Sequence, residues 1–185
     1  MSLLRLEGVA CIRGGRLLFD ELDLALGAGD AVRLVGPNGA GKSSLIRLAA
    51  GLLVPAAGRV SRSGEVALAD EGIALDRERR LGVALCWWEP RKPVDAAMGA
   101  LGLTDLAQVP VRLLSTGQLR RARLARVVAS GAPLWLLDEP VNGLDDDGTG
   151  RLSRVIAEHR QRGGAVLAAS HVPLAGEWRT LVLAA

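Results

Sequence analysis

Several residue types are scarce in this 185-residue sequence, and each scarcity excludes a class of protein. Tyrosine is absent and aromatic residues make up 3% of the chain, so the core must be built from Leu, Val and Ala. The two cysteines, Cys11 and Cys86, are far apart and are accompanied by only two histidines. This pattern argues against a zinc cluster and a disulfide framework, and it fits a reducing compartment.

Long apolar runs and a strong charge bias are also missing. No run approaches the roughly 18 apolar residues of a transmembrane helix, and Arg5 and Glu7 interrupt the first residues before an apolar targeting segment can form. The 23 Lys and Arg residues outnumber the 20 Asp and Glu residues by three, which gives a net charge of +3. This surplus is too small to indicate a nucleic-acid partner. At about 150 residues per domain, the length predicts one globular domain.

A glycine-rich motif stands between an apolar, strand-like run at residues 31–35 and a helical pattern. Its residues are Gly36, Pro37, Asn38, Gly39, Ala40, Gly41, Lys42 and Ser43, followed by Ser44. The motif matches G-x-x-x-x-G-K-[ST], whose backbone N–H groups cradle the phosphates of ATP at a helix N-terminus. Lys42 would contact the β- and γ-phosphates, and Ser43 would be a ligand of Mg²⁺. Apolar residues at helical spacing, with Leu52 as the last of them, predict a helix that ends near Gly51.

Two short apolar runs, residues 133–137 and 165–169, predict strands buried on both faces of a parallel sheet, with a helix over residues 147–162 between them. The first run ends in Asp138 and Glu139, at the sheet edge where ligands collect. Asp138 would hold Mg²⁺ through water, and Glu139 would orient or deprotonate the attacking water. His159 falls in the charged helix and is interpreted as a solvated side chain.

A third element comprises Leu114, Ser115, Thr116, Gly117 and Gln118. We expect a helix to begin at its N-cap Ser115 and to run to Gly131. In order with the other two motifs, this element resembles the Leu-Ser-Gly-Gly-Gln signature of ABC-type ATPases. The segment that ends in Asp145 resembles the D-loop of the same family, and His171, after the second apolar run, resembles its switch histidine.

The resemblance covers nearly the whole chain and implies an α/β P-loop NTPase fold of the ABC ATPase type. Such a fold has a mostly parallel central sheet, an N-terminal antiparallel β portion and a short helical subdomain. The nucleotide-binding core would comprise residues 1–70 and 115–185, and the helical lobe residues 71–114.

The resemblance also implies partners and a location. It implies a homodimer in which each ATP lies between the P-loop of one copy and the signature of the other, Ser115 to Gln118. Integral membrane permease subunits would bind beside the helical lobe. The protein would then be peripheral, at the cytoplasmic face of the cell inner membrane.

Three positions depart from the family pattern. Arg13 stands near the place where many members stack an aromatic side chain on adenine, and its guanidinium would lie over the base instead. Glu71 takes the place of the Q-loop glutamine, where its carboxylate would bind Mg²⁺ but repel the γ-phosphate. Thr116 replaces the first signature glycine and adds a β-branched side chain near the phosphate.

Less specific sequence features, among them the form of the signature from Leu114 to Arg121, resemble the subfamily that serves c-type cytochrome biogenesis. That likeness implies an energy-coupling subunit for the handling of haem or a haem complex. Two alternatives stay open: a soluble ABC-type ATPase that acts on nucleic acid or ribosomes, and an ATP-binding regulatory module without transport. We expect no nucleic-acid partner, because we interpret most arginines from Arg120 to Arg126 as a solvated helix face.

Overall fold

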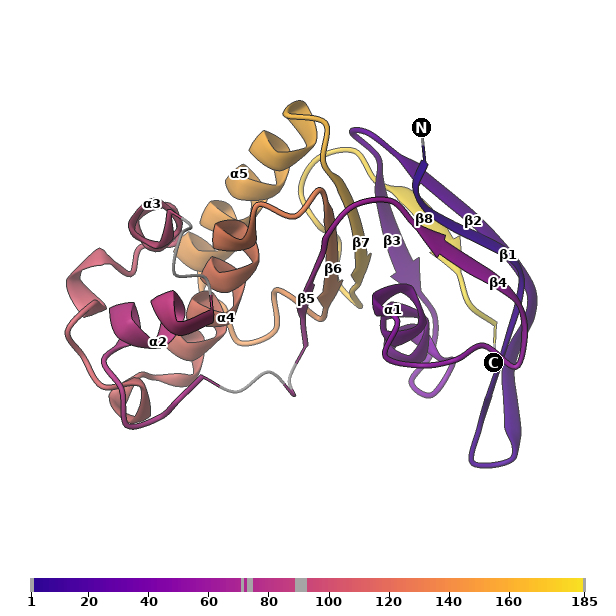
Figure 1. The fold of residues 1–185 in the computed structure, drawn as a ribbon, viewed down its shortest axis with the longest axis horizontal. Coiled ribbons are helices and arrows are strands. Elements are labelled where there is room, and N and C mark those ends of the chain that lie inside the picture. The colour runs from indigo at the N-terminus through magenta and orange to yellow at the C-terminus, as the bar shows by residue number, and fades with distance from the viewer. Residues whose placement is uncertain (1, 71, 73–74, 89–92, 185) are drawn as a thin grey trace.

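Two β-sheets of different type organise the computed structural model, which describes residues 2–70, 72, 75–88 and 93–184 (Figure 1). The antiparallel sheet has the order β2-β1-β4 and is formed by β1 (Ser2–Arg13), β2 (Arg16–Gly27) and β4 (Ala57–Arg62). The parallel sheet has the order β5-β6-β7-β3-β8 and is formed by β5 (Val66–Ala69), β6 (Leu134–Asp138), β7 (Ala165–Ala169), β3 (Ala31–Val35) and β8 (Arg179–Val182). The predicted α/β architecture with an antiparallel N-terminal portion is confirmed.

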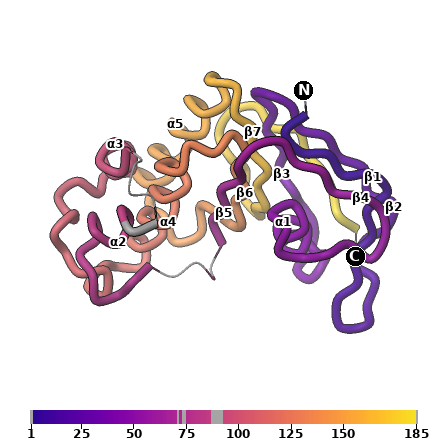
Figure 2. The backbone as a smooth tube through the Cα atoms, viewed as in Figure 1, coloured from indigo at the N-terminus to yellow at the C-terminus, as the bar shows by residue number. Residues whose placement is uncertain are grey.

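The helices are α1 (Lys42–Ala50), α2 (Leu81–Trp88), α3 (Val94–Ala100), α4 (Thr116–Ser130) and α5 (Asp146–Gln161). Figures 1 and 2 show α2 and α3 at the end of the molecule away from the antiparallel sheet, where they pack on α4. These two helices and the 3-10 turns Thr104–Leu106 and Val111–Leu113 fall within residues 71–114, the range expected for the helical lobe. Among the helices of the described ranges, none combines the length and the apolar character that a membrane span requires.

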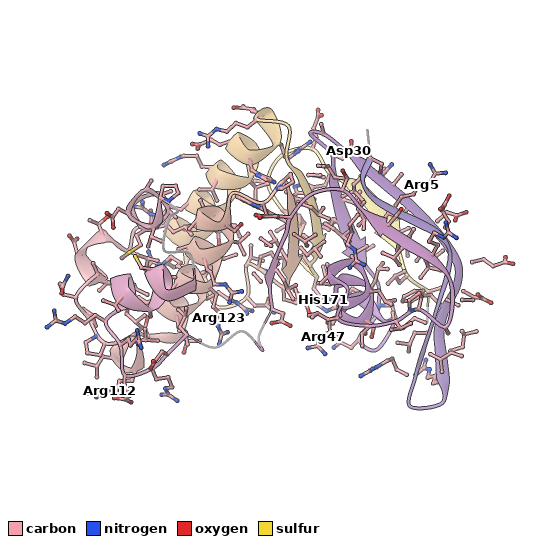
Figure 3. The ribbon with its side chains drawn as sticks, viewed as in Figure 1. Arg5, Asp30, Arg47, Arg112, Arg123 and His171 are labelled. Atoms are coloured by element: carbon pink, nitrogen blue, oxygen red, sulfur yellow. The ribbon has the colours of Figure 1, made fainter. Side chains whose placement is uncertain are left out.

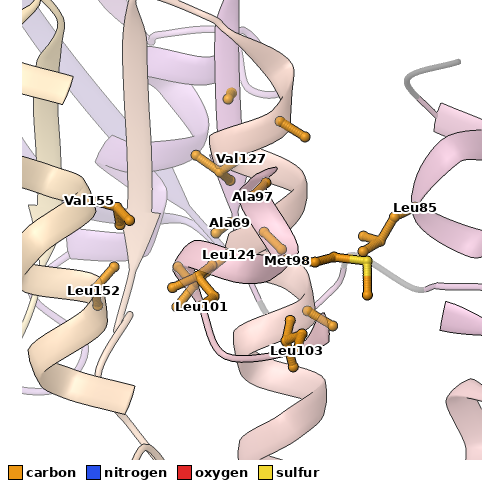
Figure 4. Close-up of a cluster of buried hydrophobic side chains, with 14 of the residues drawn as sticks. Ala69, Leu85, Ala97, Met98, Leu101, Leu103, Leu124, Val127, Leu152 and Val155 are labelled. Carbon is orange, nitrogen blue, oxygen red and sulfur yellow. The ribbon is translucent and has the colours of Figure 1, made fainter. Parts of the chain in front are cut away.

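Strand β6 is buried on both faces, as its continuous apolar run predicts. Leu134 and Leu136 pack in a cluster with α1 and the antiparallel sheet, whereas Trp135 and Leu137 pack in a second cluster with the helices on the other face. Figure 4 shows part of this second cluster, to which α3, α4 and α5 contribute Ala97, Met98, Leu124, Val127, Leu152 and Val155. The packing on both faces fixes the end of β6, from which Asp138 and Glu139 follow.

The ends of two helices follow the expected capping residues. Ser115 is the N-cap of α4, and Gly51 and Gly131 end α1 and α4 in the left-handed conformation, with φ of 79° and 66°. These predictions are confirmed. The predicted place of Leu52 on the apolar face of α1 is wrong, because the chain leaves the helix at Gly51 and Leu52 is 62% exposed.

His159 is not the solvated side chain that the charge pattern of its helix suggested. Its ring stacks on Trp135 of β6, with ring centroids 3.8 Å apart and planes inclined by 10°. Gly164 lies against the imidazole, and a Cβ at this position would collide with the ring. Burial lowers the pKa of His159 below its usual value, because the protonated ring loses hydration there. The solvated interpretation is wrong because α5 turns this residue toward the sheet.

Candidate active site

The glycine-rich loop connects β3, which lies inside the parallel sheet, to the first residue of α1. Two of its glycines are required by close approach. Gly36 has φ of 150°, and a Cβ there would collide with the carbonyl oxygen of Leu183. Gly41 has φ of 99°, and a Cβ there would lie 3.0 Å from the ring of Phe19. The loop backbone therefore packs closely against Leu183 and Phe19 at these two glycines.

Lys42 is held inside this loop and is 7% exposed. Its Nζ donates hydrogen bonds to the carbonyl oxygens of Gly36 at 2.8 Å and Pro37 at 3.0 Å. The ammonium thus lies within the ring of the loop, where it meets any anion that the loop N–H groups bind. A compact ammonium suits this position better than a planar guanidinium.

A cavity of about 340 Å³ joins the loop to the ends of the parallel strands. It is lined by Leu18, Asn38, Gly39, Gly41, Lys42, Ser43, Ser44, Glu139 and His171. Figure 3 shows the labelled His171 near α1. The fold therefore brings much of the predicted phosphate loop together with Glu139 and His171, which lie about a hundred and more residues further along the chain.

Glu139 follows β6 directly and has a positive φ of 47°, a conformation that costs a residue with a side chain about 1–3 kcal/mol. Its N–H donates to the carbonyl oxygen of Ala169 at 2.9 Å. Its Oε1 lies 3.3 Å from Nε2 of His171, and the backbone N–H of His171 donates to Oε2 at 3.4 Å. A carboxylate and an imidazole thus share one wall of the cavity, where they can accept and hold a proton.

Of the two oxygen donors predicted for Mg²⁺ in the described residues, Ser43 lines the cavity, whereas Asp138 directly precedes Glu139 and is not among the lining residues. Ser43 is exposed in the first turn of α1, and Asp138 is the last residue of β6, paired with Ala169 of β7. In the described part of the chain, no cluster of three or more His, Cys, Asp or Glu side chains could hold a metal. A hydroxyl and one carboxylate fit Mg²⁺, which keeps several waters and takes substrate phosphates as ligands. Glu71, the third predicted ligand, lies outside the described residues.

The predicted signature forms a capping box. The Ser115 hydroxyl oxygen accepts a hydrogen bond from the N–H of Gln118 at 3.2 Å, and the N–H of Ser115 donates to Gln118 Oε1 at 2.9 Å. Ser115 and Thr116 are exposed. Residues 115–118 are not among those that line the cavity around Lys42.

Two other predicted site residues stand apart from the cavity lining. Asp145 is the N-cap of α5, where its carboxylate accepts a hydrogen bond from the N–H of Gly148 at 2.8 Å. Arg13 is exposed at the end of β1, beside the turn to β2, and it does not line the cavity. The prediction that Arg13 lies over adenine stays a prediction.

Sequence reasoning missed the role of two arginines in α4. Arg120 is only 9% exposed and donates to the carbonyl oxygens of Asn142 and Glu139, at 3.1 and 3.0 Å. Arg121 donates to the carbonyl oxygens of Leu101 and Gly102, at 3.3 and 3.4 Å. Their interpretation as part of a solvated face is wrong, because both side chains turn toward neighbouring backbone. Helical spacing indicates a buried position for Arg120, because Arg120 lies four residues before the buried Leu124 and therefore on the same side of α4.

The phosphate loop, the carboxylate and histidine beside it, and the capped signature helix define an ATPase of the P-loop class. The family model for ABC transporters matches residues 19–142. The cytochrome c biogenesis ATP-binding export protein CcmA of Sphingopyxis alaskensis is 62% identical over 178 residues, which cover 94% of this chain and 92% of that protein. The protein of the same name from Novosphingobium aromaticivorans is 55% identical over 176 residues, which cover 95% of this chain and 92% of that protein.

A solved structure agrees with these sequence relationships. An inward-facing transporter assigned to the metal-chelate ABC type superposes with a TM-score of 0.84 at 25% identity, over 99% of this chain and 80% of that one. The chain belongs to the ABC transporter family, as one of its ATPases.

Proposed function

We propose that the chain hydrolyses Mg-ATP as one of two identical subunits that energise a membrane complex for c-type cytochrome biogenesis. The observation that carries this proposal is the cavity in which Lys42, Glu139 and His171 meet. The finer assignment is supported by the two relatives, since both are named for cytochrome c biogenesis and ATP-binding export.

Residues 36–44 hold the triphosphate of ATP in this proposal. The loop N–H groups and the N-terminus of α1 bind phosphate oxygens, and the buried Lys42 ammonium neutralises the β- and γ-phosphates. Ser43 and Asp138 hold Mg²⁺, with Glu71 as a further candidate, and the ion withdraws charge from the phosphates. Arg13 covers the adenine, as its place in the sequence suggests.

Hydrolysis requires a water to attack the γ-phosphorus while the bond between that phosphorus and the bridging oxygen of ADP breaks. Glu139 accepts the proton that the water loses, because its carboxylate lines the cavity that Lys42 also lines. His171 holds the carboxylate through Nε2 and its backbone N–H, so that an oxygen of Glu139 stays directed at the water.

The second copy completes the site. Ser115 and Thr116 are exposed at the N-terminus of α4, where the helix dipole favours an anion. The Ser115 oxygen accepts from the Gln118 N–H, so its own O–H proton is available for an oxygen of the γ-phosphate bound by the partner. Gly117 and Gln118 complete that contact, and Asp145 fixes the adjacent D-loop by capping α5.

Membrane permease subunits are the partners that this assignment requires, and they place the protein at the cytoplasmic face of the inner membrane. Haem or a haem complex is the cargo class that we propose. The nucleic-acid alternative is weakened, because Arg120 and Arg121 of the arginine-rich helix donate hydrogen bonds to backbone carbonyls of their own chain.

Affinity purification from mildly solubilised membranes tests the assignment to a complex. We expect the tagged full chain to retain hydrophobic membrane subunits of cytochrome c maturation, with untagged cells as the control. Recovery of RNA or DNA with a steep loss at raised salt, or of membrane subunits of an unrelated process, would overturn it.

A further inference from the structure

Arg120 connects the signature helix to the turn that carries Glu139. It lies in the second turn of α4 and is 9% exposed. Its Nη2 donates to the carbonyl oxygen of Glu139 at 3.0 Å, and its Nε donates to the carbonyl oxygen of Asn142 at 3.1 Å. The planar guanidinium therefore spans both ends of the segment between Glu139 and Asn142, and a rigid fork suits such a two-point contact.

The segment that Arg120 spans has an unusual backbone. Glu139 is one of two non-glycine residues with positive φ in the described ranges, at 47°. The Asn142 N–H donates to the Glu139 carbonyl oxygen at 3.2 Å, so this oxygen accepts from both the turn and the guanidinium. A left-handed conformation at a residue with a side chain persists only where its surroundings hold it. The hydrogen bonds from Arg120 to the carbonyl oxygens of Glu139 and Asn142 are among the contacts that surround this backbone.

The same helix meets this region at a second point. A Cβ at Gly117 would lie 3.0 Å from the carbonyl oxygen of Gly143, so the N-terminus of α4 packs closely on the segment after Asn142. Ser115, which caps the helix, is only five residues before Arg120. The first turn of α4 thus carries the signature. Its second turn carries Arg120, which donates hydrogen bonds to the segment that begins at Glu139.

We propose that Arg120 is a positioning residue for hydrolysis: it holds the backbone of Glu139 and couples the signature helix of a subunit to the general base of the same subunit. A shift of α4 on contact with the partner's ATP would move the Glu139 carbonyl through this guanidinium. The inference rests on the proposed role of Glu139 as the base.

Steady-state kinetics of the full chain test this inference. In Arg120→Met, kcat for ATP should fall by about 10- to 100-fold, because a small displacement of a catalytic group has an effect of that size. The KM for ATP should change by less than about threefold, since the phosphate loop is untouched. Arg120→Lys keeps a buried cation without the fork and should have an intermediate kcat, which also provides the test if the Met variant does not fold.

The neighbouring arginine supplies a matched control. Arg121 also donates to two backbone carbonyls, but these belong to Leu101 and Gly102 of the helical region. Arg121→Met should have kcat within about twofold of the parent protein while losing thermal stability to a similar extent as Arg120→Met. Equal losses of kcat in the two variants, or an Arg120→Met enzyme with normal kcat, would overturn the inference.

A double variant separates this inference from the function on which it rests. If Arg120 acts through Glu139, adding Arg120→Met to Glu139→Gln should lower the residual kcat by no more than about twofold. If Arg120→Met lowers kcat by the same factor in the Glu139→Gln variant as in the parent protein, Arg120 acts elsewhere and the positioning role is overturned. Normal turnover by Glu139→Gln alone would instead overturn the proposed base, whatever Arg120 does.

Discussion

Replacing Glu139 by glutamine is expected to lower ATP turnover by at least about 10²-fold and to leave Mg-ATP binding intact. Glutamine has nearly the same shape and retains one oxygen that can accept the His171 N–H, which now donates to Oε2 at 3.4 Å. It cannot accept the proton that the attacking water loses. The measurements are phosphate release at saturating Mg-ATP and binding of ATP to the same preparation.

A bound but uncleaved nucleotide should also hold two copies of Glu139→Gln together, because each ATP would then keep its contact with the partner's signature. The mass in solution with Mg-ATP should therefore double. Glu158→Gln is the matched control, since Glu158 pairs with Arg162 on the surface of α5, and it should hydrolyse ATP normally. Undiminished turnover by Glu139→Gln would remove Glu139 from the role of base.

Replacing Lys42 by alanine should abolish measurable turnover and weaken ATP binding. The variant loses the one ammonium that the phosphate loop encloses, and the carbonyl oxygens of Gly36 and Pro37 lose their donor. Loss of a single donor to developing charge typically costs about 10²–10³-fold in rate, and here ground-state binding falls as well. Nucleotide titration and phosphate release report the two effects separately.

Lys42→Arg distinguishes charge from shape at the same position. Because Lys42 is 7% exposed inside a loop whose glycines already touch Leu183 and Phe19, a longer planar group has little room. We expect this variant to release no measurable phosphate although it keeps the charge, and to melt at a lower temperature because the longer side chain overpacks the loop. An Ala variant with turnover within about twofold of the parent protein would show that the loop does not serve ATP hydrolysis.

Much of the fold could be predicted from local patterns. The apolar run from Leu134 needs no partner to indicate a strand buried on both faces, and Ser115 and Gly131 mark the ends of α4 by their own chemistry. The motif that begins at Gly36 and the residues on either side of it likewise predict a strand, a loop and a helix in that order. Such features depend only on neighbours in the sequence, so they can be predicted without knowledge of the fold.

Features that depend on packing between distant segments could not be predicted. Helical spacing places Arg120 on the side of α4 that carries the buried Leu124, but it does not show that the guanidinium reaches the Glu139 carbonyl, which depends on how α4 lies against the end of β6. His159 looked solvated among charged residues, yet the return of the chain through Gly164 places its ring on Trp135. In both cases an element that lies elsewhere in the sequence covers a polar side chain of a charged helix, almost fully for Arg120 and partly for His159.

The central claim, that each ATP is hydrolysed between two copies of this chain, is tested most directly by ATPase activity as a function of protein concentration. With Mg-ATP in excess, the activity per molecule should be near zero in dilute protein and should rise to a plateau as the protein concentration increases. This rise should coincide with the appearance of a dimer by mass. Activity strictly proportional to concentration, with a monomeric mass throughout, would contradict it.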